Sequence, residues 1–335
     1  MTAIVITPRG PFSLAASLRF LEGFTPAGYR DASDGRVLRL AFPADDGHST
    51  VSAEVRQAEG SEGSEGSEGS EGSEGTVQAD VTVHTGNPGN DGMGTATAES
   101  DGMSAVRAQL ARILSLDVDG SGFPRLAEAD PVVAQLIAAY PGLRPVCFYS
   151  PYEAAAWAVI GHRIRMVQAA AIKARIAEHH GPRVTVAGES LHAFPTPLVL
   201  RGLSRVPGLP ETKVERLRVL ADAALAGDLD AARLRAMPTE DALAHLRTLP
   251  GIGPFSAELI LIRGAGHPDV FPRHERRLHA SMADAYGLGD PDASDARRLA
   301  GISDHWAPYR SWVALLLRTR REEQAGPAAR GRSVR

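Results

Sequence analysis

Three segments near the start of the chain alternate apolar and polar residues with a period of two. They cover residues 36–42, 49–56 and 76–85. Such alternation is typical of strands that bury one face, so we expect a small antiparallel sheet. Ahead of them, Leu14, Leu18 and Leu21 fall on one face of a helix expected over residues 12–24. The first part of the chain therefore predicts an α+β domain.

A low-complexity insert separates the second and third of these segments. It is a Glu-Gly-Ser triplet repeated five times, over residues 59–75. Because it has no apolar residue to bury, it cannot offset the entropy of ordering, and we expect a disordered loop. A hairpin tip tolerates such an insertion at little cost. The stretch 86–102 is again rich in glycine, and we place the end of the α+β domain at residue 103.

From Ser104 onward the pattern changes to helical periodicity interrupted by proline and glycine, with no convincing strand. We expect an all-α domain over 104–321 and a flexible basic tail over 322–335. At one helix start, Ser150 can cap, Pro151 suits the first turn and Glu153 can reach back to the cap. Helices are expected over 151–161, 163–180, 211–226, 239–248, 255–264, 274–286 and 303–321.

Composition narrows the class of protein. The 335 residues are enough for about two domains. A single cysteine, Cys147, excludes an internal disulfide, a cysteine-based zinc site and a four-cysteine iron–sulfur cluster. No apolar run approaches the length of a membrane span, and the start of the chain lacks a basic segment followed by an apolar one. We expect a cytoplasmic protein with no membrane partner.

The net charge of −4 hides an asymmetry between the two parts of the chain. Residues 1–103 carry 6 arginines and no lysine against 16 acidic residues, a net charge of −10. Residues 104–335 carry 30 basic against 24 acidic residues, a net charge of +6. The second part could therefore bind a polyanion, whereas the acidic first part is expected to brace it. The arginine-rich end at 318–321 is read as a solvated helix face.

The most informative motif is Leu-Pro-Gly-Ile-Gly at 249–253, between two expected helices. Gly251 and Gly253 allow a tight turn that exposes backbone N–H groups at the start of the next helix. A DNA phosphate can bind there without a basic side chain. Ile252 would pack between the two helices. The alternative is an ordinary turn between antiparallel helices. A shorter version at 206–210 lacks the second glycine and is read as a turn that leads into a helix.

This motif resembles the helix-hairpin-helix DNA glycosylase superfamily, and within it the 3-methyladenine DNA glycosylase II branch. Further segments that carry the resemblance are 140–144, 154–161, 207–225, 269–272 (Asp-Val-Phe-Pro) and 306–314 (Trp-Ala-Pro-Tyr-Arg-Ser-Trp-Val-Ala). The resemblance spans about residues 104–320, and the first domain is similar to the branch's accessory domain. It implies an α+β accessory domain followed by an all-α helix-hairpin-helix glycosylase domain.

The resemblance also implies an activity: a monofunctional DNA glycosylase that flips alkylated purines of the 3-methyladenine type out of duplex DNA in base-excision repair. A carboxylate would assist hydrolysis of the N-glycosidic bond. The expected partner is double-stranded DNA with a damaged base, and the protein is expected to act as a monomer. No side-chain metal site or organic cofactor is expected. A monovalent cation held by backbone carbonyls of the hairpin is implied by the resemblance alone.

The catalytic position departs from the family pattern. The family has an aspartate three residues after the proline of the Phe-Pro step, and this chain has Glu275 there. The extra methylene keeps the charge but moves it by roughly 1 Å, a shift that can cost about a hundredfold in rate. Two alternatives stay open: Glu275 only stabilises the start of its helix, or His274 acts as the acid or base.

The resemblance places Phe255 as the aromatic residue that stacks on the extruded base. One turn on, where the branch often has a second aromatic residue, this chain has Leu259. Phe255 also stands where glycosylases that cleave the backbone carry a lysine. The chain has only two lysines, Lys173 and Lys213, so a strand-cleaving lyase is not expected.

Two residues between helices correspond to the loop that fills the gap left by a flipped base. They are His162 and Arg163, with Arg163 as the wedge. The family usually has glutamine followed by an apolar residue, so both positions depart, and the alternative is a solvated helix junction.

Two other readings of the whole chain remain: a DNA-binding protein on a glycosylase scaffold that releases no base, and a helical interaction protein whose hairpin binds nothing. Trp306, Tyr309 and Trp312 are expected to pack rather than bind a base.

Overall fold

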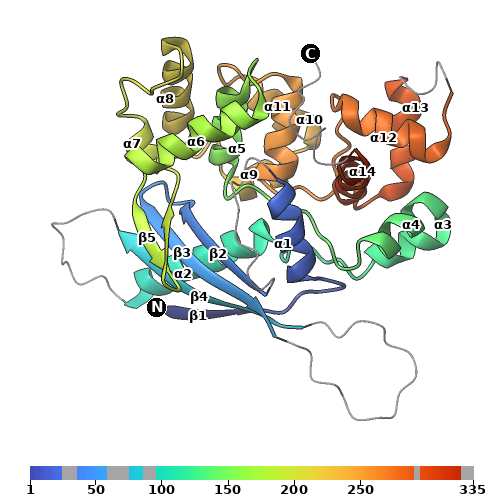
Figure 1. Cartoon of the computed structure of the whole chain (residues 1–335), viewed down its shortest axis with the longest axis horizontal. Coiled ribbons are helices and arrows are strands. Elements are labelled where there is room, and N and C mark those ends of the chain that lie inside the picture. The colour runs from blue at the N-terminus through green and yellow to red at the C-terminus, as the bar shows by residue number, and fades with distance from the viewer. Residues whose placement is uncertain (25–35, 59–74, 86–95, 290–294, 326–335) are drawn as a thin grey trace, which may run out of the picture.

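The computed structural model describes residues 1–24, 36–58, 75–85, 96–289 and 295–325. Four strands form an antiparallel sheet in the order β1-β4-β3-β2 (Figure 1). They are β1 (Thr2–Ile6), β2 (Val37–Pro43), β3 (Ser49–Gln57) and β4 (Val77–Thr85). Alternation predicted the last three to within one residue at each end, and it missed β1. The Glu-Gly-Ser repeat joins β3 to β4 as predicted, but all of it except Gly75 lies outside the described residues.

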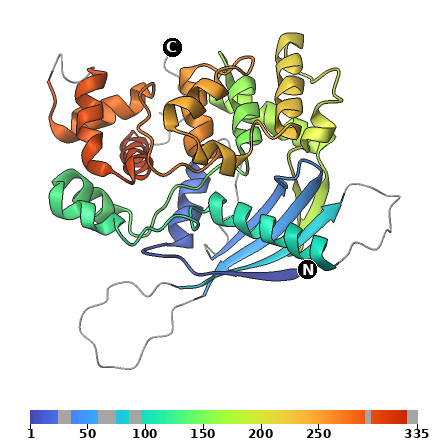
Figure 2. The ribbon, with the colours of Figure 1, turned by 180° about the vertical axis from the view of Figure 1, so that it is seen from behind.

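Two helices bury the apolar face of this sheet. They are α1 (Leu14–Gly23) and α2 (Ala96–Ile113), and Figure 2 shows α2 lying across the strands. Leu18 of α1 and Leu110 of α2 belong to the same buried cluster as the sheet residues. The predicted boundary at residue 103 is therefore wrong, because it falls inside α2. The stretch 86–102, expected to be loose, is helical from Ala96 onward, and its first part, 86–95, lies outside the described residues.

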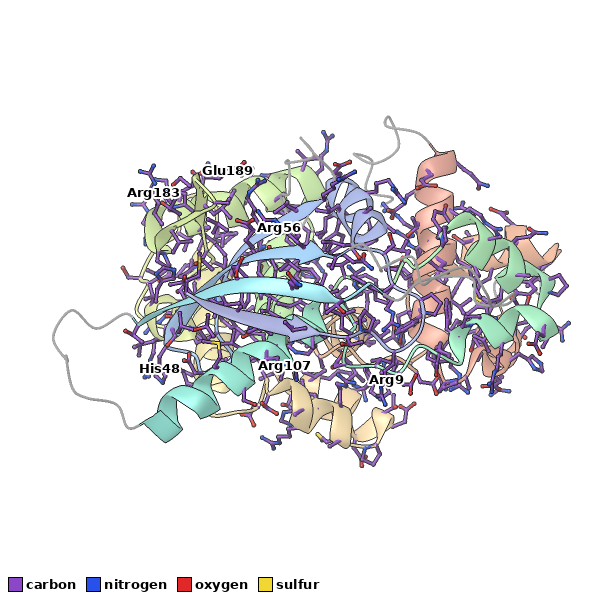
Figure 3. All side chains as sticks on the ribbon, turned by 90° about the horizontal axis from the view of Figure 1, so that it is seen from below. Arg9, His48, Arg56, Arg107, Arg183 and Glu189 are labelled. Carbon is purple, nitrogen blue, oxygen red and sulfur yellow. The ribbon has the colours of Figure 1, made fainter. Side chains whose placement is uncertain are left out.

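A second hairpin corrects the expectation of an all-α second domain. It consists of β5 (Arg183–Val186) and β6 (Glu189–His192). Val184 and Val186 pack with Ala41 of β2. Glu189, labelled in Figure 3, lies 3.5 Å from Arg39 of the same strand. Because this hairpin covers part of the sheet, β2 and β3 are buried along almost their whole length rather than on one face only.

Helices account for most of the remainder. Up to the hairpin motif they are η2 (Phe123–Arg125), α3 (Leu126–Ala129), α4 (Pro131–Ala139), α5 (Pro151–Gly161), α6 (Met166–His180), α7 (Pro197–Leu200), α8 (Glu211–Leu225), α9 (Ala231–Ala236) and α10 (Thr239–Leu246). The start of α5 forms as predicted, with the Ser150 side chain accepting a hydrogen bond from the Glu153 amide at 3.1 Å. The Glu153 carboxylate does not complete the cap. It pairs instead with Lys173 of α6, at 2.5 Å.

The last part of the chain is more broken than the periodicity predicted. It contains α11 (Pro254–Leu259), the π-helical turn η3 (Ile260–Gly264), α12 (Arg276–Tyr286), α13 (Ala296–Ser303), η5 (Asp304–Trp306) and α14 (Arg310–Gln324). The single helix expected over 303–321 is three elements, because Pro308 cannot continue one. Trp306, Tyr309 and Trp312 are buried in one core with α4 and α12, which confirms that they pack. The expected tail begins too early, since α14 ends at Gln324.

The structure was also searched for membrane-spanning helices, metal-binding clusters and a reactive cysteine. Among the described residues, no helix is long and apolar enough to cross a bilayer. The same part of the chain has no group of three or more His, Cys, Asp or Glu side chains arranged to bind a metal. Cys147 is a free, buried thiol, and burial raises its pKa. It is therefore an apolar core residue rather than a nucleophile.

Candidate active site

One large cavity lies where the two parts of the fold meet. Its volume is about 730 Å³, and it is lined by residues of α1, α5, α11, α12 and α14. Four of the residues singled out by the sequence reach it: His162, Phe255, Leu259 and Glu275. The hairpin residues and Arg163 are not among its lining residues. Phe20 of α1 and Phe24, the C-cap of that helix, belong to the wall, so the first domain forms part of this cavity.

The predicted hairpin is present between α10 and α11. Gly251 has φ +87°, a conformation that favours glycine, and Gly253 is the N-cap of α11. Ile252 is buried between the helices as predicted. A Cβ at Gly253 would contact nothing within 4 Å, so the start of α11 faces open space. Neither glycine amide donates a hydrogen bond within the described residues, which leaves both N–H groups available to a phosphate.

Phe255 is unusual among the large apolar residues because 46% of its surface is exposed. It lies in the first turn of α11 and lines the cavity. An exposed ring at the edge of a cavity is suited to stack on a planar base. Leu259, one turn later, is partly buried against the core around α5 and lines the same cavity.

Glu275 stands at the start of α12 and caps it. Its Oε1 accepts a hydrogen bond from the Arg277 amide at 3.3 Å and lies 3.5 Å from Nη1 of Arg318. About a quarter of the side chain is exposed, and it lines the cavity. The start of the helix and the guanidinium both place positive potential beside this carboxylate. Glu275 thus both stabilises its helix and presents a carboxylate to the cavity, so the two readings do not exclude each other.

Glu258 was not predicted as a functional residue. Its side chain is 4% exposed and accepts three hydrogen bonds: from the Arg273 amide at 3.1 Å, the His274 amide at 3.0 Å and the His274 Nδ1 at 2.7 Å. These contacts fix the loop that leads into Glu275. His274 faces Glu258 and is not among the cavity-lining residues. The sequence did contain a signal for this role: Glu258 is a lone carboxylate inside the apolar run at 257–262, and a buried carboxylate needs hydrogen-bond partners.

Arg318 was expected on a solvated face, and the structure contradicts this. Its side chain is 18% exposed, lines the cavity, and pairs with both Glu275 and Glu322. The face of α14 that carries it points inward because the apolar core around α12 and α14 fixes the rotation of the helix. Arg321, three residues on, pairs with Asp284 and is not among the cavity-lining residues.

The loop between α5 and α6 carries His162 and Arg163. Arg163 is exposed and has φ +59°, which is strained for a residue with a side chain. Lys213 of α8 holds the loop in place: its Nζ donates hydrogen bonds to the carbonyl oxygens of Ile160 and His162, both at 2.8 Å. Burial, followed by the positive charges of Arg163, Lys213 and Arg216, lowers the pKa of His162.

The two lysines have structural roles. Lys213 is buried beneath this loop, and burial lowers its pKa. Lys173 pairs with Glu153. Neither is among the lining residues of the cavity. Neither amine is therefore placed to form a Schiff base with a sugar in this cavity.

Two of the matching segments are in direct contact. Arg310 donates to Asp269 at 2.7 Å, and the Ser311 hydroxyl is hydrogen-bonded to the backbone of Val270 at 3.0 and 3.1 Å. These contacts join the start of α14 to the segment that precedes Phe271. Of these residues, Ser311 lines the cavity.

Comparison with known proteins gives consistent results, although no family model matches the chain. The chain is 29% identical to DNA-3-methyladenine glycosylase 2 of Escherichia coli, over 64% of this chain and 73% of that protein. It is 26% identical to DNA-3-methyladenine glycosylase of Bacillus subtilis, over 60% of this chain and 67% of that protein. It is 30% identical to the probable bifunctional transcriptional activator/DNA repair enzyme AlkA of Mycobacterium tuberculosis, but covers only 42% of that protein.

Solved structures agree in fold. The 3-methyladenine DNA glycosylase of Archaeoglobus fulgidus superposes with a TM-score of 0.67 at 22% identity, over 95% of this chain and 97% of that one. MBOgg1, solved with a low-affinity DNA ligand, superposes with a TM-score of 0.61 at 15% identity, over 96% of this chain and 97% of that one. The predicted fold class, a sheet-containing first domain followed by a helical one, is confirmed apart from the β5–β6 hairpin. The chain therefore has the fold of these DNA glycosylases, and its sequence is similar to those of bacterial DNA-3-methyladenine glycosylases.

Proposed function

We propose that this chain is a monofunctional DNA glycosylase that excises alkylated purines from double-stranded DNA. The observation that carries the proposal is that Phe255 and Glu275, which come from different helices, line one cavity of about 730 Å³. This volume lies within the usual range for small-molecule sites. The names of the bacterial relatives support the same reaction.

The hairpin would hold the DNA backbone. The amides of Gly251 and Gly253, which donate no hydrogen bond within the described residues, would bind a phosphate next to the lesion. The damaged base would rotate into the cavity and stack on Phe255. Arg163, exposed on the loop between α5 and α6, would fill the space left in the duplex.

Glu275 would assist cleavage of the N-glycosidic bond. As the N-glycosidic bond breaks, the sugar gains positive charge, and the ionised carboxylate would stabilise that charge and orient the attacking water. Because Glu258 and the N-cap contact fix both sides of Glu275, the carboxylate is held in place before substrate binds. With neither lysine in the cavity, the reaction ends at the abasic site.

A monovalent cation at the hairpin remains part of this proposal. The carbonyl oxygens of Pro250 and Gly251 accept no hydrogen bond within the described residues, whereas those of Leu249 and Gly253 are already used by Ile252 and Ala257. Two adjacent unpaired carbonyls are suitable ligands for a hard cation. Such an ion would add positive charge next to the bound phosphate. The protein would act on DNA as a monomer.

Single-turnover release of free base from methylated duplex DNA tests the proposal. We expect Glu275→Gln to lower the rate at least a hundredfold and Glu275→Asp to keep it, because Asp retains the charge. Glu215→Gln, a change of an exposed carboxylate on α8, is the matched control and should leave the rate unchanged. A normal rate in the Glu275→Gln variant would refute the catalytic role of Glu275. Duplex binding by the wild type without release of any base would favour the DNA-binding scaffold instead.

A further inference from the structure

One arginine next to the hairpin has no acidic partner. Arg216 lies on the second turn of α8 and is half-buried. Its guanidinium makes no hydrogen bond and no ion pair within the described residues. The residues three and four positions away on its face of the helix include no acidic one: they are Thr212, Lys213, Val219 and Leu220. The N–H donors of this guanidinium are therefore available to a ligand that offers oxygen acceptors.

The Arg216 side chain packs against the hairpin itself. A Cβ built on Gly251 would lie 3.0 Å from Cδ, 3.3 Å from Nη1 and 3.4 Å from Nε of Arg216, and these are its three nearest atoms outside the adjoining residues. Because Cβ and the amide nitrogen of a residue are bonded to the same Cα, the guanidinium also stands close to the Gly251 amide. That amide donates no hydrogen bond within the described residues. A charged donor and a backbone donor thus lie side by side, both without an acceptor.

The same helix connects the hairpin with the loop that carries Arg163. Lys213, one turn before Arg216, donates hydrogen bonds to two carbonyl oxygens of that loop. Burial, and after it the positive charge of Arg216, lowers the pKa of Lys213. The charge of Arg216 also contributes, after burial and two other positive charges, to the lowered pKa of His162. Arg216 is therefore near both the hairpin and the loop that is expected to enter the duplex.

Building on the proposed function, which supplies DNA as the ligand, we propose that Arg216 and the hairpin form one composite phosphate site. The guanidinium binds an oxygen of the same backbone phosphate that accepts hydrogen bonds from the amides of Gly251 and Gly253. The backbone amides are neutral, whereas the arginine adds a full positive charge and a planar fork of donors that matches a phosphate. Because the preceding turn of α8 holds the loop with Arg163, a phosphate bound here also fixes the strand relative to that loop.

The first test measures how duplex affinity depends on salt. The probe is a duplex with one tetrahydrofuran abasic-site analogue, which has no base to release, titrated by fluorescence anisotropy. Loss of one phosphate contact lowers the slope of log affinity against log salt by about 0.9. We expect Arg216→Met to bind about tenfold more weakly than wild type at 50 mM salt and about threefold more weakly at 200 mM. Arg216→Lys should keep the slope because it keeps the charge. Arg218→Met is the matched control: this exposed arginine of α8 donates to the Arg201 carbonyl oxygen instead.

A second test asks whether the arginine and the hairpin bind the same phosphate. Each phosphate around the abasic analogue is replaced in turn by a neutral methylphosphonate. The position that belongs to the hairpin is the one at which Gly253→Glu no longer weakens binding, because the repelled charge is gone. We expect the effect of Arg216→Met to vanish at the same position. Two different positions would overturn the composite site.

The slope separates a lost contact from lost protein, since it does not depend on the fraction of folded molecules. An unchanged slope in Arg216→Met would overturn the inference, while base release by the wild type would leave the proposed function intact. An equal fall of the slope in Arg218→Met would also overturn it, because the effect would then come from net charge. If the wild type binds the duplex but releases no base from methylated DNA, the proposed function fails, and the slope of Arg216→Met still decides the phosphate contact.

Discussion

Removing the Glu258 carboxylate is the sharpest test of how the site is built. In Glu258→Ala, the amides of Arg273 and His274 and the His274 ring lose their acceptor. Hydrogen bonds to a charged acceptor contribute roughly 1.5–3 kcal/mol each. Because Arg273 and His274 are exposed, water can replace part of this stabilisation. We therefore expect a loss of about 2–4 kcal/mol in the free energy of unfolding, measured by urea denaturation.

The same change should affect catalysis more than binding. Glu275 follows His274 directly, and a displacement of about 1 Å can lower the rate about a hundredfold. We expect single-turnover base release by Glu258→Ala to fall by that order, with duplex affinity changed less than about threefold because the hairpin is separate. Glu258→Gln keeps an acceptor and should be intermediate. Glu215→Ala on the exposed face of α8 is the control. A normal rate in Glu258→Ala would refute the idea that this carboxylate places Glu275.

Three further predictions concern the DNA-facing loops. Gly253→Glu should keep the fold, because a Cβ there meets nothing within 4 Å, yet weaken duplex binding at least tenfold in a fluorescence-anisotropy titration by repelling phosphate. Arg163→Gly should lower base release at least tenfold without loss of stability in urea, since glycine tolerates φ +59° at no steric cost; a clear loss of stability would argue against a functional strain. Because the pKa of His162 is lowered, this residue should be neutral at pH 7 and take up a proton only in more acidic solution. Duplex affinity should then rise as pH falls from 7 to 5, and an equal rise in His162→Asn would contradict this origin.

The sequence predicts best what depends on neighbouring residues. The hairpin at 249–253 combines two glycines and an apolar residue in a local turn, and each takes its expected place. Strands β2, β3 and β4 follow directly from alternation. The hairpin β5–β6 is only four residues per strand, and it is held by packing on β2, which periodicity cannot detect.

The site contained two contacts that no local pattern could indicate. Glu258 meets the loop before Glu275 only because the chain returns to α11 after the Phe-Pro step. We expected the Arg318 side chain to face solvent, because a run of basic residues usually does. The rotation of α14 is instead set by the apolar core against which the helix packs. In both cases the partner is distant in sequence, so that the pairing appears only when helices are placed in three dimensions.

The buried Arg144 bears on whether the two parts of the fold could be separated. The residue is 1% exposed, and its guanidinium donates to the carbonyl oxygens of five residues. They are Arg9, Gly10, Pro11, Ser115 and Val118. It also lies 5.1 Å from the Trp312 ring of α14.

A helical fragment made without the first strands would lose three of these acceptors and leave a buried cation incompletely paired, a defect that typically costs several kcal/mol. The α+β part is thus no detachable module. Gene fusions and truncations that treat residue 104 as a cutting point should yield protein that fails to fold, and recombination between relatives should preserve the first eleven residues together with Arg144 and α14.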